Sequence, residues 1–302
     1  MNLIKKISTK KIIVLLLATL IIFALIFRTS VQFDELISVL RNAKIVYIML
    51  AILAGFAGTV LGTIRWYLLI RITNYHVSFR RIFALIMATW TLSIIPGRIG
   101  DFAKAYPLRK SIPIPISIGT IAFEKIIDVI SLLFLSMAGF FYIGMPRFSL
   151  LLLTGIAALV VFLLLTQKIH RYFPPKIADF VRNALTVLVM AKSHKMALTG
   201  SVLASAVNWL MSIAIIFFLF LAFDVHINIP PILAYLPLAI IIGLLPISVA
   251  GMGTRDSALI FFLLPFAPAA EILAVGLGYS FIGYFLFAIL GIPYLIKEIR
   301  TA

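Results

Sequence analysis

An arginine and an aspartate, Arg98 and Asp101, directly follow a proline–glycine break inside an otherwise apolar stretch of this chain. An arginine at bilayer depth costs on the order of 2.5–3.5 kcal/mol on insertion scales, so such a residue is usually paired or functional. Gly97 and Gly100 allow close backbone approach, and a helix beginning near Asp101 would present its positive N-terminal end to an anion. We expect this segment to bind an anionic group such as a lipid phosphate; a structural Arg98–Asp101 cap is the alternative.

A second glycine-rich break carries the other candidate binding residues, which are Gly251, Gly253, Thr254 and Arg255. Asp256, next to them, is expected to balance charge or to couple transport to protons. Thr254 is a good N-cap for a helix over 255–264. If two hairpins enter the membrane from opposite faces, their helix N-termini meet in the centre, and Arg255 joins Arg98 in one cationic pocket. Structural pairing of Arg255 with a carboxylate of the apolar segment 116–144 is an equally supported alternative.

Three charged residues interrupt the apolar segment 116–144: Glu124, Lys125 and Asp128. Glu124 and Asp128 are four positions apart and therefore share one face of a helix. Two carboxylates on an apolar helix are not expected to face lipid, because a charge in hydrocarbon is costly. We expect them to be counter-ions for Arg98 and Arg255. Proton coupling is the alternative, since burial favours the neutral form of a carboxyl group.

Arg65 and Trp66 end the second apolar segment and are typical of an anchor at the membrane–water interface. A role for Arg65 in gating a lipid headgroup is the alternative. The sequence contains no cysteine, no His-Glu-x-x-His motif and no phosphate loop, and its four histidines are scattered. We therefore expect no catalytic residues of a recognised pattern, no metal and no cofactor.

The composition indicates an integral membrane protein. Apolar residues make up 63% of the 302 positions and charged residues 12%, whereas a soluble domain has about 25% charged residues. The net charge of +16 lies mainly in short loops between apolar segments. There it attracts lipid headgroups and sets orientation, so we do not expect nucleic-acid binding. We expect residues 1–302 to form a single membrane domain.

Six apolar segments are predicted to cross the bilayer as helices: 12–27, 45–64, 116–144, 149–166, 197–222 and 272–296. Shorter apolar runs beside the two glycine-rich breaks are typical of re-entrant helical hairpins, which we place at 82–110 and 231–265. The expected fold is an all-α polytopic membrane protein with six spanning helices and two re-entrant hairpins.

The basic residues support this topology. With the N-terminus in the cytoplasm, 19 lysines and arginines fall in cytoplasmic segments and four in outer loops, as the positive-inside rule requires. If either hairpin crossed completely, the basic loop 167–196 would face outward. We therefore expect a cell-membrane protein with both termini in the cytoplasm. Its halves, 1–145 and 148–302, then have opposite topology and form an inverted repeat.

Several motifs together resemble the transmembrane domain of lysylphosphatidylglycerol synthases, which also occurs as stand-alone flippase-like proteins. The matching elements are Arg65-Trp66, Ile95-Pro96-Gly97-Arg98-x-Gly100-Asp101 with Lys104, Phe123-Glu124-Lys125-x-x-Asp128 and Pro246 with Gly251-x-Gly253. Lys125 and Asp256 stand where family members often have arginine and glutamate. In the synthases a separate soluble domain transfers lysine, and we do not expect that activity here.

We expect a flippase- or scramblase-like translocase for an anionic or phosphate-bearing lipid, such as an aminoacyl-phospholipid or a polyprenyl-phosphate lipid. An intramembrane enzyme or accessory subunit in aminoacyl-lipid or lipid-linked glycan synthesis is the alternative, and a structural partner without a substrate is a third. The expected partners are membrane lipids and a lipid-synthesis enzyme.

Overall fold

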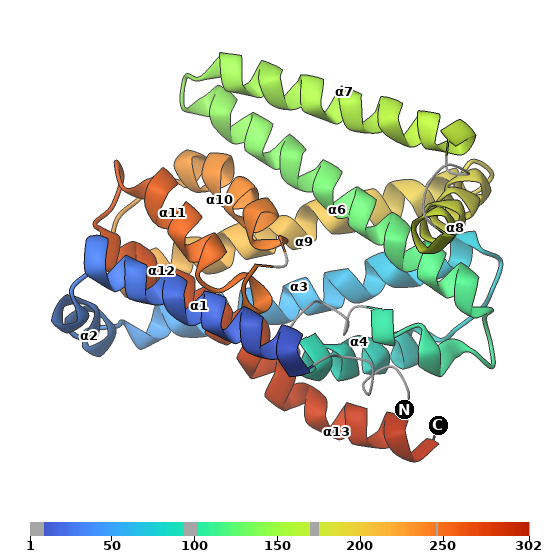
Figure 1. The fold of residues 1–302 in the computed structure, drawn as a ribbon, viewed down its shortest axis with the longest axis horizontal. Helices are drawn as coiled ribbons and strands as arrows, with labels where there is room; N and C mark the ends of the chain where they lie inside the picture. Colours follow the sequence, from blue (N-terminus) through green and yellow to red (C-terminus); the bar gives the residue numbers. More distant parts are fainter. Residues whose placement is uncertain (1–8, 94–101, 170–174, 246, 302) are drawn as a thin grey trace.

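The computed structural model describes residues 9–93, 102–169, 175–245 and 247–301, and the regular structure within them is helical (Figure 1). This confirms the expected all-α class. The elements in chain order are α1 (Thr9–Thr29), α2 (Phe33–Arg41), α3 (Ile45–Ile72), α4 (Phe79–Ser93), η2 (Tyr106–Leu108), α6 (Ile114–Tyr142), α7 (Pro146–Ile169), α8 (Pro175–Ala191), α9 (Lys195–Ala222), α10 (Ile229–Gly243), η4 (Val249–Gly251), α11 (Thr254–Leu263), α12 (Ala269–Ser280), η5 (Phe281–Leu286) and α13 (Phe287–Thr301).

Three stretches of described helix are long and apolar enough to cross a bilayer: Ile45–Ile72, Lys195–Ala222 and the continuous Ala269–Arg300. The bent pair of α1 and α2, whose axes differ by 94°, raises the number to four if it is taken as one span. The protein is therefore a multi-pass membrane protein. The helices α6 and α7 occupy two more of the segments predicted to span, so the six expected spans all fall on helices.

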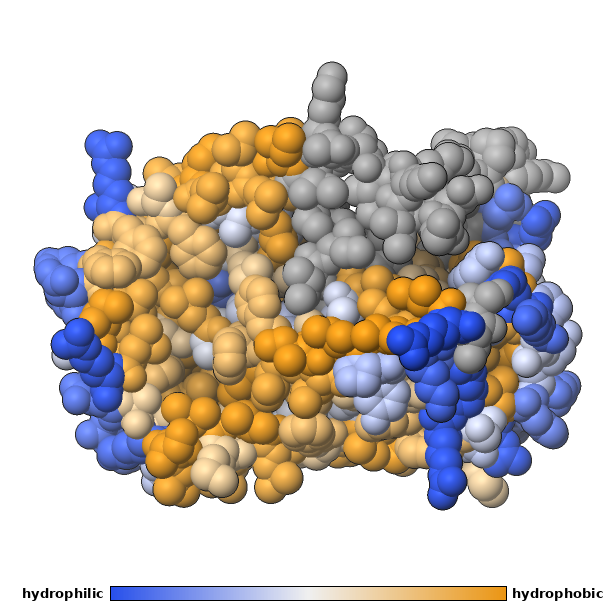
Figure 2. All heavy atoms as spheres, turned by 90° about the horizontal axis from the view of Figure 1, so that it is seen from below, coloured by the Kyte–Doolittle hydropathy of each residue, from blue (hydrophilic) through white to orange (hydrophobic). Residues whose placement is uncertain are grey.

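The surface supports this assignment. Apolar side chains cover most of the face shown in Figure 2, and hydrophilic residues gather toward its two ends. Leu20, Leu53, Leu151 and Phe261 are each more than half exposed. An apolar surface of this extent is not stable in water, and acyl chains would cover it.

The helices α3 and α9 run antiparallel along the centre of the bundle (Figure 1). Just before α3, the backbone N–H of Lys44 donates to the carbonyl of Ala222 at the end of α9, over 2.8 Å. At the opposite end of the pair, His194 Nε2 lies 3.0 Å from Asn74 Oδ1. The two helices are therefore held at both of their ends.

Two helix pairs recur at a fixed interval along the chain. The helices α3 and α9 both have 28 residues and begin at positions 45 and 195. The helices α4 and α10 both have 15 residues and begin at 79 and 229, the same interval of 150. The turns that follow α3 and α9 also correspond, because Asn74 (φ 62°) and Asp224 (φ 63°) are 150 positions apart and both adopt the left-handed conformation.

The second predicted hairpin is present as a helical hairpin. The helices α10 and α11 pack side by side (Figure 1) and are joined by a turn that contains η4. Three residues of this turn have positive φ: Ala250 (52°), Gly251 (77°) and Gly253 (88°). Gly251 is required there for a second reason, because a Cβ atom would lie 2.8 Å from the carbonyl oxygen of Gly243. Pro246 and the break of the first hairpin, 94–101, lie outside the described residues.

Candidate functional site

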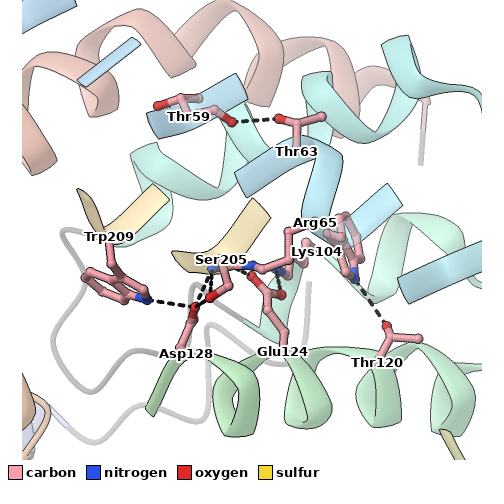
Figure 3. Close-up of polar contacts among 10 residues, drawn as sticks. Thr59, Thr63, Arg65, Lys104, Thr120, Glu124, Asp128, Ser205 and Trp209 are labelled. Atoms are coloured by element: carbon pink, nitrogen blue, oxygen red, sulfur yellow. Dashed lines mark hydrogen bonds and ion pairs between the residues drawn. The ribbon is translucent and has the colours of Figure 1, made fainter. Parts of the chain in front are cut away.

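The centre of the site is Arg65 of α3, which is 6% exposed. Its guanidinium forms ion pairs with Glu124, over 2.5 Å, and with Asp128 (Figure 3). Both carboxylates project from α6 one helical turn apart, as their spacing of four predicts. All three side chains are less than 10% exposed, so this is a buried ionic cluster.

A second cation completes the cluster. Lys104 Nζ lies 2.6 Å from Glu124 Oε2 and 4.4 Å from the centre of the Trp66 ring. The ring face carries negative charge density and attracts the ammonium group. The Trp66 indole N–H in turn donates to Thr120 of α6 over 3.1 Å. Two cations and two carboxylates therefore balance, which is what stable burial of charge requires.

The helix α9 contributes neutral donors to the same cluster. Ser205 Oγ and Trp209 Nε1 donate to Asp128 Oδ1 over 2.8 and 3.0 Å. The Asp128 carboxylate thus joins α3, α6 and α9 at one point (Figure 3). Hydrogen bonds to a charged acceptor are stronger than neutral ones, so these contacts hold the three helices in register.

The ionic cluster opens on a cavity of about 180 Å³. Besides Arg65, Lys104, Glu124 and Asp128, its lining includes Lys125 and the aromatic residues Trp209 and Tyr284. Ala250, from the turn of the second hairpin, also lines it. Residues from both halves of the chain therefore line one cavity, and charged side chains form part of its wall.

Arg255 lies at the start of α11 and is 2% exposed. Its Nε and Nη2 atoms both donate to Asp256 Oδ1, over 3.0 and 2.6 Å, and Nη2 also donates to the Gly276 carbonyl and to Ser280. The ion pair of Arg255 is thus with its neighbour Asp256. The alternative in which it pairs with a carboxylate of segment 116–144 is wrong.

Arg255 lines a smaller cavity of about 50 Å³. This cavity shares Trp209, Ala250 and Tyr284 with the larger one, so the two adjoin. The guanidinium also lies 4.8 Å from the centre of the Tyr279 ring. The second hairpin therefore presents a buried cation next to the central ionic cluster.

Two interpretations of the sequence are corrected by these positions. Arg65 and Trp66 are not interfacial anchors: they are 6% and 0% exposed, inside the protein. The helix α3 continues to Ile72, so Arg65 lies about two turns before its end. Thr254 is the first residue of α11 rather than its N-cap, which is Gly253; Asp256 Oδ2 accepts the Gly253 N–H over 3.0 Å.

The remaining predicted residues divide into two groups. Arg98, Gly97, Gly100 and Asp101 lie outside the described residues. Glu124 and Asp128 are counter-ions, as expected, but their described partners are Arg65 and Lys104. The sequence alone indicates no separate role for Lys104. The signal that could have found it is a lone lysine just after an apolar break, with carboxylates on the next helix.

The arrangement offers charge and hydrogen bonds. Among the described residues there is no group of three or more His, Asp or Glu side chains that could hold a metal ion. A charged group inside the cavity could take the place of one partner in the ion pairs of the cluster, and it would then be shielded from hydrocarbon.

An apolar helical bundle with an ionic cluster buried in its interior defines a multi-pass membrane protein with an internal polar site. Residues 12–291 match the family model for the lysylphosphatidylglycerol synthase TM region, and the chain belongs to this family. A UPF0104 membrane protein of Methanocaldococcus jannaschii is 24% identical, over 94% of this chain and 93% of that protein. Another UPF0104 membrane protein, of Methanothermobacter thermautotrophicus, is 23% identical over 76% of this chain and 78% of its own.

Proposed function

We propose that this protein moves a lipid with an anionic or phosphate-bearing headgroup between the two leaflets, with the headgroup passing through the central cavity near Arg255 and Arg98. The observation that carries the proposal is the buried ionic cluster of Arg65, Lys104, Glu124 and Asp128 beside a cavity of about 180 Å³. Ionisable residues inside a membrane are costly, and they commonly mark the path of a polar substrate.

The proposed path needs a site that can be reached from either leaflet, and an inverted repeat provides one. The recurrence of α3 and α4 as α9 and α10, 150 positions later, supports such a repeat. The packing supports it too: α4 packs against α13 and α10 against α6, the pairing expected when the halves 1–145 and 148–302 exchange roles. Transporters commonly use inverted repeats, with substrate held at the repeat interface.

The same scheme places six spanning helices and two re-entrant hairpins in the cell membrane, with both termini in the cytoplasm. The helix bounds support it, because the predicted spans 45–64 and 197–222 fall within α3 and α9. The turn of the second hairpin lines the central cavity through Ala250. Backbone without regular structure is tolerated at membrane depth where it lines such a cavity.

Leaflet exchange in reconstituted vesicles tests the function. Purified protein is incorporated into liposomes that carry a trace of headgroup-labelled anionic phospholipid or of polyprenyl phosphate in the inner leaflet. We expect the label to reach the outer leaflet faster than in protein-free vesicles. The absence of exchange for every lipid tested would falsify translocation. A new lipid species in cells that overproduce the protein would instead favour the enzymatic alternative.

A matched pair of variants connects exchange to the site. Lys104→Gln removes a cation that lines the cavity, whereas Arg182→Gln removes one from the exposed pair with Asp179 on α8. We expect slower exchange for the first variant and unchanged exchange for the second. Equal rates for both would contradict the assignment of the path to this cavity.

A further inference from the structure

A further cavity, of about 300 Å³, lies apart from the central site, and we call it the peripheral cavity. It is formed by the start of α4, the turn that follows η2 and the last turn of α13 (Figure 1), and its polar lining residues are Arg81, Arg109, Lys110, Ser111 and Glu298. None of these residues lines the central cavity. Sites for small molecules commonly have volumes of about 300–1,000 Å³, so the peripheral cavity has room for a chemical group larger than water.

The turn that carries Lys110 and Ser111 is held firmly in the fold. The residues on either side of it, Leu108 and Ile112, are 2% and 1% exposed and belong to a buried apolar cluster that includes Ile82 of α4. The backbone N–H groups of Ser111 and Ile112 both donate to the Leu108 carbonyl, over 2.8 Å each. The backbone of Lys110 and Ser111 is therefore fixed beside the peripheral cavity.

The polar groups of these two residues are accessible donors. Lys110 and Ser111 are exposed, and neither side chain makes an ion pair or a hydrogen bond with the described part of the chain. The carboxylate among the described lining residues, Glu298, already accepts two hydrogen bonds from Arg81, of which the one from Nη2 to Oε2 spans 2.7 Å. Arg109 adds a further positive charge to the lining. An ammonium and a hydroxyl group can therefore bind an anion here without breaking an existing contact.

The opposite end of the molecule shows that the 150-residue recurrence of the helices does not require this charge. Val77 and Ile227, which are 150 positions apart, each line one cavity at the turn that follows α3 or α9. The described lining of the cavity at Ile227 contains no lysine, arginine, aspartate or glutamate. Near the start of α10, Pro231 stands where Arg81 stands near the start of α4. The cations are thus particular to the peripheral cavity.

The position of the peripheral cavity suits a phosphate group. The cavity lies where α3 ends and α4 begins, at one end of the bundle, and hydrophilic residues gather at such ends (Figure 2). Lipid headgroups lie at this depth when the apolar helices span the bilayer. The positive-inside rule explains cations on one side of a membrane, but it does not require them to line a cavity. Phosphate oxygens accept several charge-assisted hydrogen bonds at once, as a lysine and a serine side by side would donate.

We propose that the peripheral cavity binds a phosphate group, supplied by a lipid headgroup or by a soluble phosphate, and that Lys110 and Ser111 are its donors. Lys110 Nζ and Ser111 Oγ each donate to one phosphate oxygen, and the charge of Arg109 adds attraction over a longer distance. Arg81 stays paired with Glu298, so the contact between α4 and α13 is kept. The site is independent of the proposed translocation, because none of these residues lines the central cavity.

Cysteine labelling of the full-length protein tests this binding. The chain contains no cysteine, so Val77→Cys places a single thiol in the lining of the peripheral cavity and changes neither donor. Its rate of reaction with a neutral maleimide is measured in detergent with inorganic phosphate, with dihexanoyl phosphatidic acid or with dihexanoylglycerol, which lacks the phosphate. We expect at least one of the two phosphate compounds to slow labelling about fivefold or more at saturation, and dihexanoylglycerol to leave the rate unchanged.

The compound that protects the thiol identifies the source of the phosphate. Protection by inorganic phosphate indicates a soluble ligand, and protection by phosphatidic acid alone indicates a lipid headgroup. Asn228→Cys, in the lining of the cavity at the other end, is the matched reporter and should show no protection. If neither phosphate compound protects Val77→Cys, or if dihexanoylglycerol protects it equally well, the proposal is wrong.

Removal of the ammonium group connects the protection to Lys110. In the Val77→Cys protein, we expect Lys110→Gln to raise the ligand concentration for half-maximal protection about tenfold, because one charge-assisted hydrogen bond is lost. Lys195→Gln is the matched control: it removes the same charge from the exposed first residue of α9, at the same end of the bundle but outside the lining of the cavity. We expect it to change that concentration less than about twofold. Equal shifts for both variants would indicate attraction by the overall surface charge and would overturn the proposed site.

Discussion

Replacing Arg65 with methionine tests whether the buried ionic cluster holds α3, α6 and α9 together. Methionine keeps much of the arginine's apolar length but removes both of its ion pairs. Glu124 retains Lys104, and Asp128 retains its hydrogen bonds from α9. The four residues of the cluster nevertheless change from no net charge to a net charge of −1, and both carboxylates are less than 10% exposed.

Removing one partner of a buried ion pair costs about 3–5 kcal/mol. Because each carboxylate keeps other partners, we expect Arg65→Met to lower the free energy of unfolding by an amount near the lower limit, about 3 kcal/mol. Equilibrium unfolding in mixed micelles with rising SDS measures the change. Arg182→Met breaks a pair whose members are 64% and 61% exposed, and it should cost less than about 1 kcal/mol.

The double variant Arg65→Met with Asp128→Asn then tests the mechanism. Asparagine restores the neutrality of the cluster while it still accepts hydrogen bonds from Ser205 and Trp209. We expect the double variant to be more stable than the sum of the single changes predicts, by about 1–3 kcal/mol. Strict additivity, or an Arg65→Met protein within about 1 kcal/mol of the wild type, would refute an ionic cluster that stabilises the fold.

Three further predictions concern packing, the hairpin turn and the ends of the central helices. A Cβ at Gly139 would lie 2.2 Å from a backbone nitrogen of α10, so Gly139→Ala should cost about 1–3 kcal/mol in SDS unfolding, and Gly155→Ala, with open space around it, should not. Thr19 accepts the buried N–H at the start of η4, so Thr19→Val should cost about 1–3 kcal/mol and speed amide exchange in that turn, whereas Thr19→Ser should restore both. The hydrogen bond from Lys44, and then its charge, lower the pKa of Asp224, so the pair stabilises the fold above the ordinary aspartate pKa and this contribution is lost as pH falls. Thermal unfolding should therefore show Asp224→Asn less stable than wild type at pH 7, by a difference that shrinks as pH falls below the ordinary aspartate pKa; a difference that stays constant with pH would contradict the assignment.

Most of the secondary structure could be predicted from the local sequence. The hydropathy and length of the apolar segments predicted helices that coincide with α3, α6 and α9, because a helix in lipid must satisfy its own backbone hydrogen bonds within one continuous segment. The glycines at 251 and 253 likewise predicted the hairpin turn, since both adopt the positive φ that glycine tolerates. The interval of 150 at which α3 and α4 recur as α9 and α10 is also visible in the sequence, because His76 and His226, 150 positions apart, follow the matching turns.

Only part of the candidate functional site could be predicted from the sequence. The spacing of four predicted that Glu124 and Asp128 share a face of α6, and the family resemblance, now confirmed, indicated that the segment matters. The interpretation of Arg65 failed because an Arg-Trp pair at the end of an apolar run has the local appearance of an interfacial anchor. The helix α3 continues to Ile72, so Arg65 lies before the end of the helix and is buried inside the protein.

The sequence by itself determined the membrane class, the helices, the second hairpin and the shared face of the two carboxylates, because each depends on composition or on a period of a few residues. Only the tertiary structure decided which charges meet. Arg65 reaches Glu124 and Asp128 across 59 and 63 positions of chain, and Ser205 reaches Asp128 across 77. Such pairings follow from how whole helices pack, since electrostatic partners in a low-dielectric interior are chosen by distance in space and not by distance along the chain.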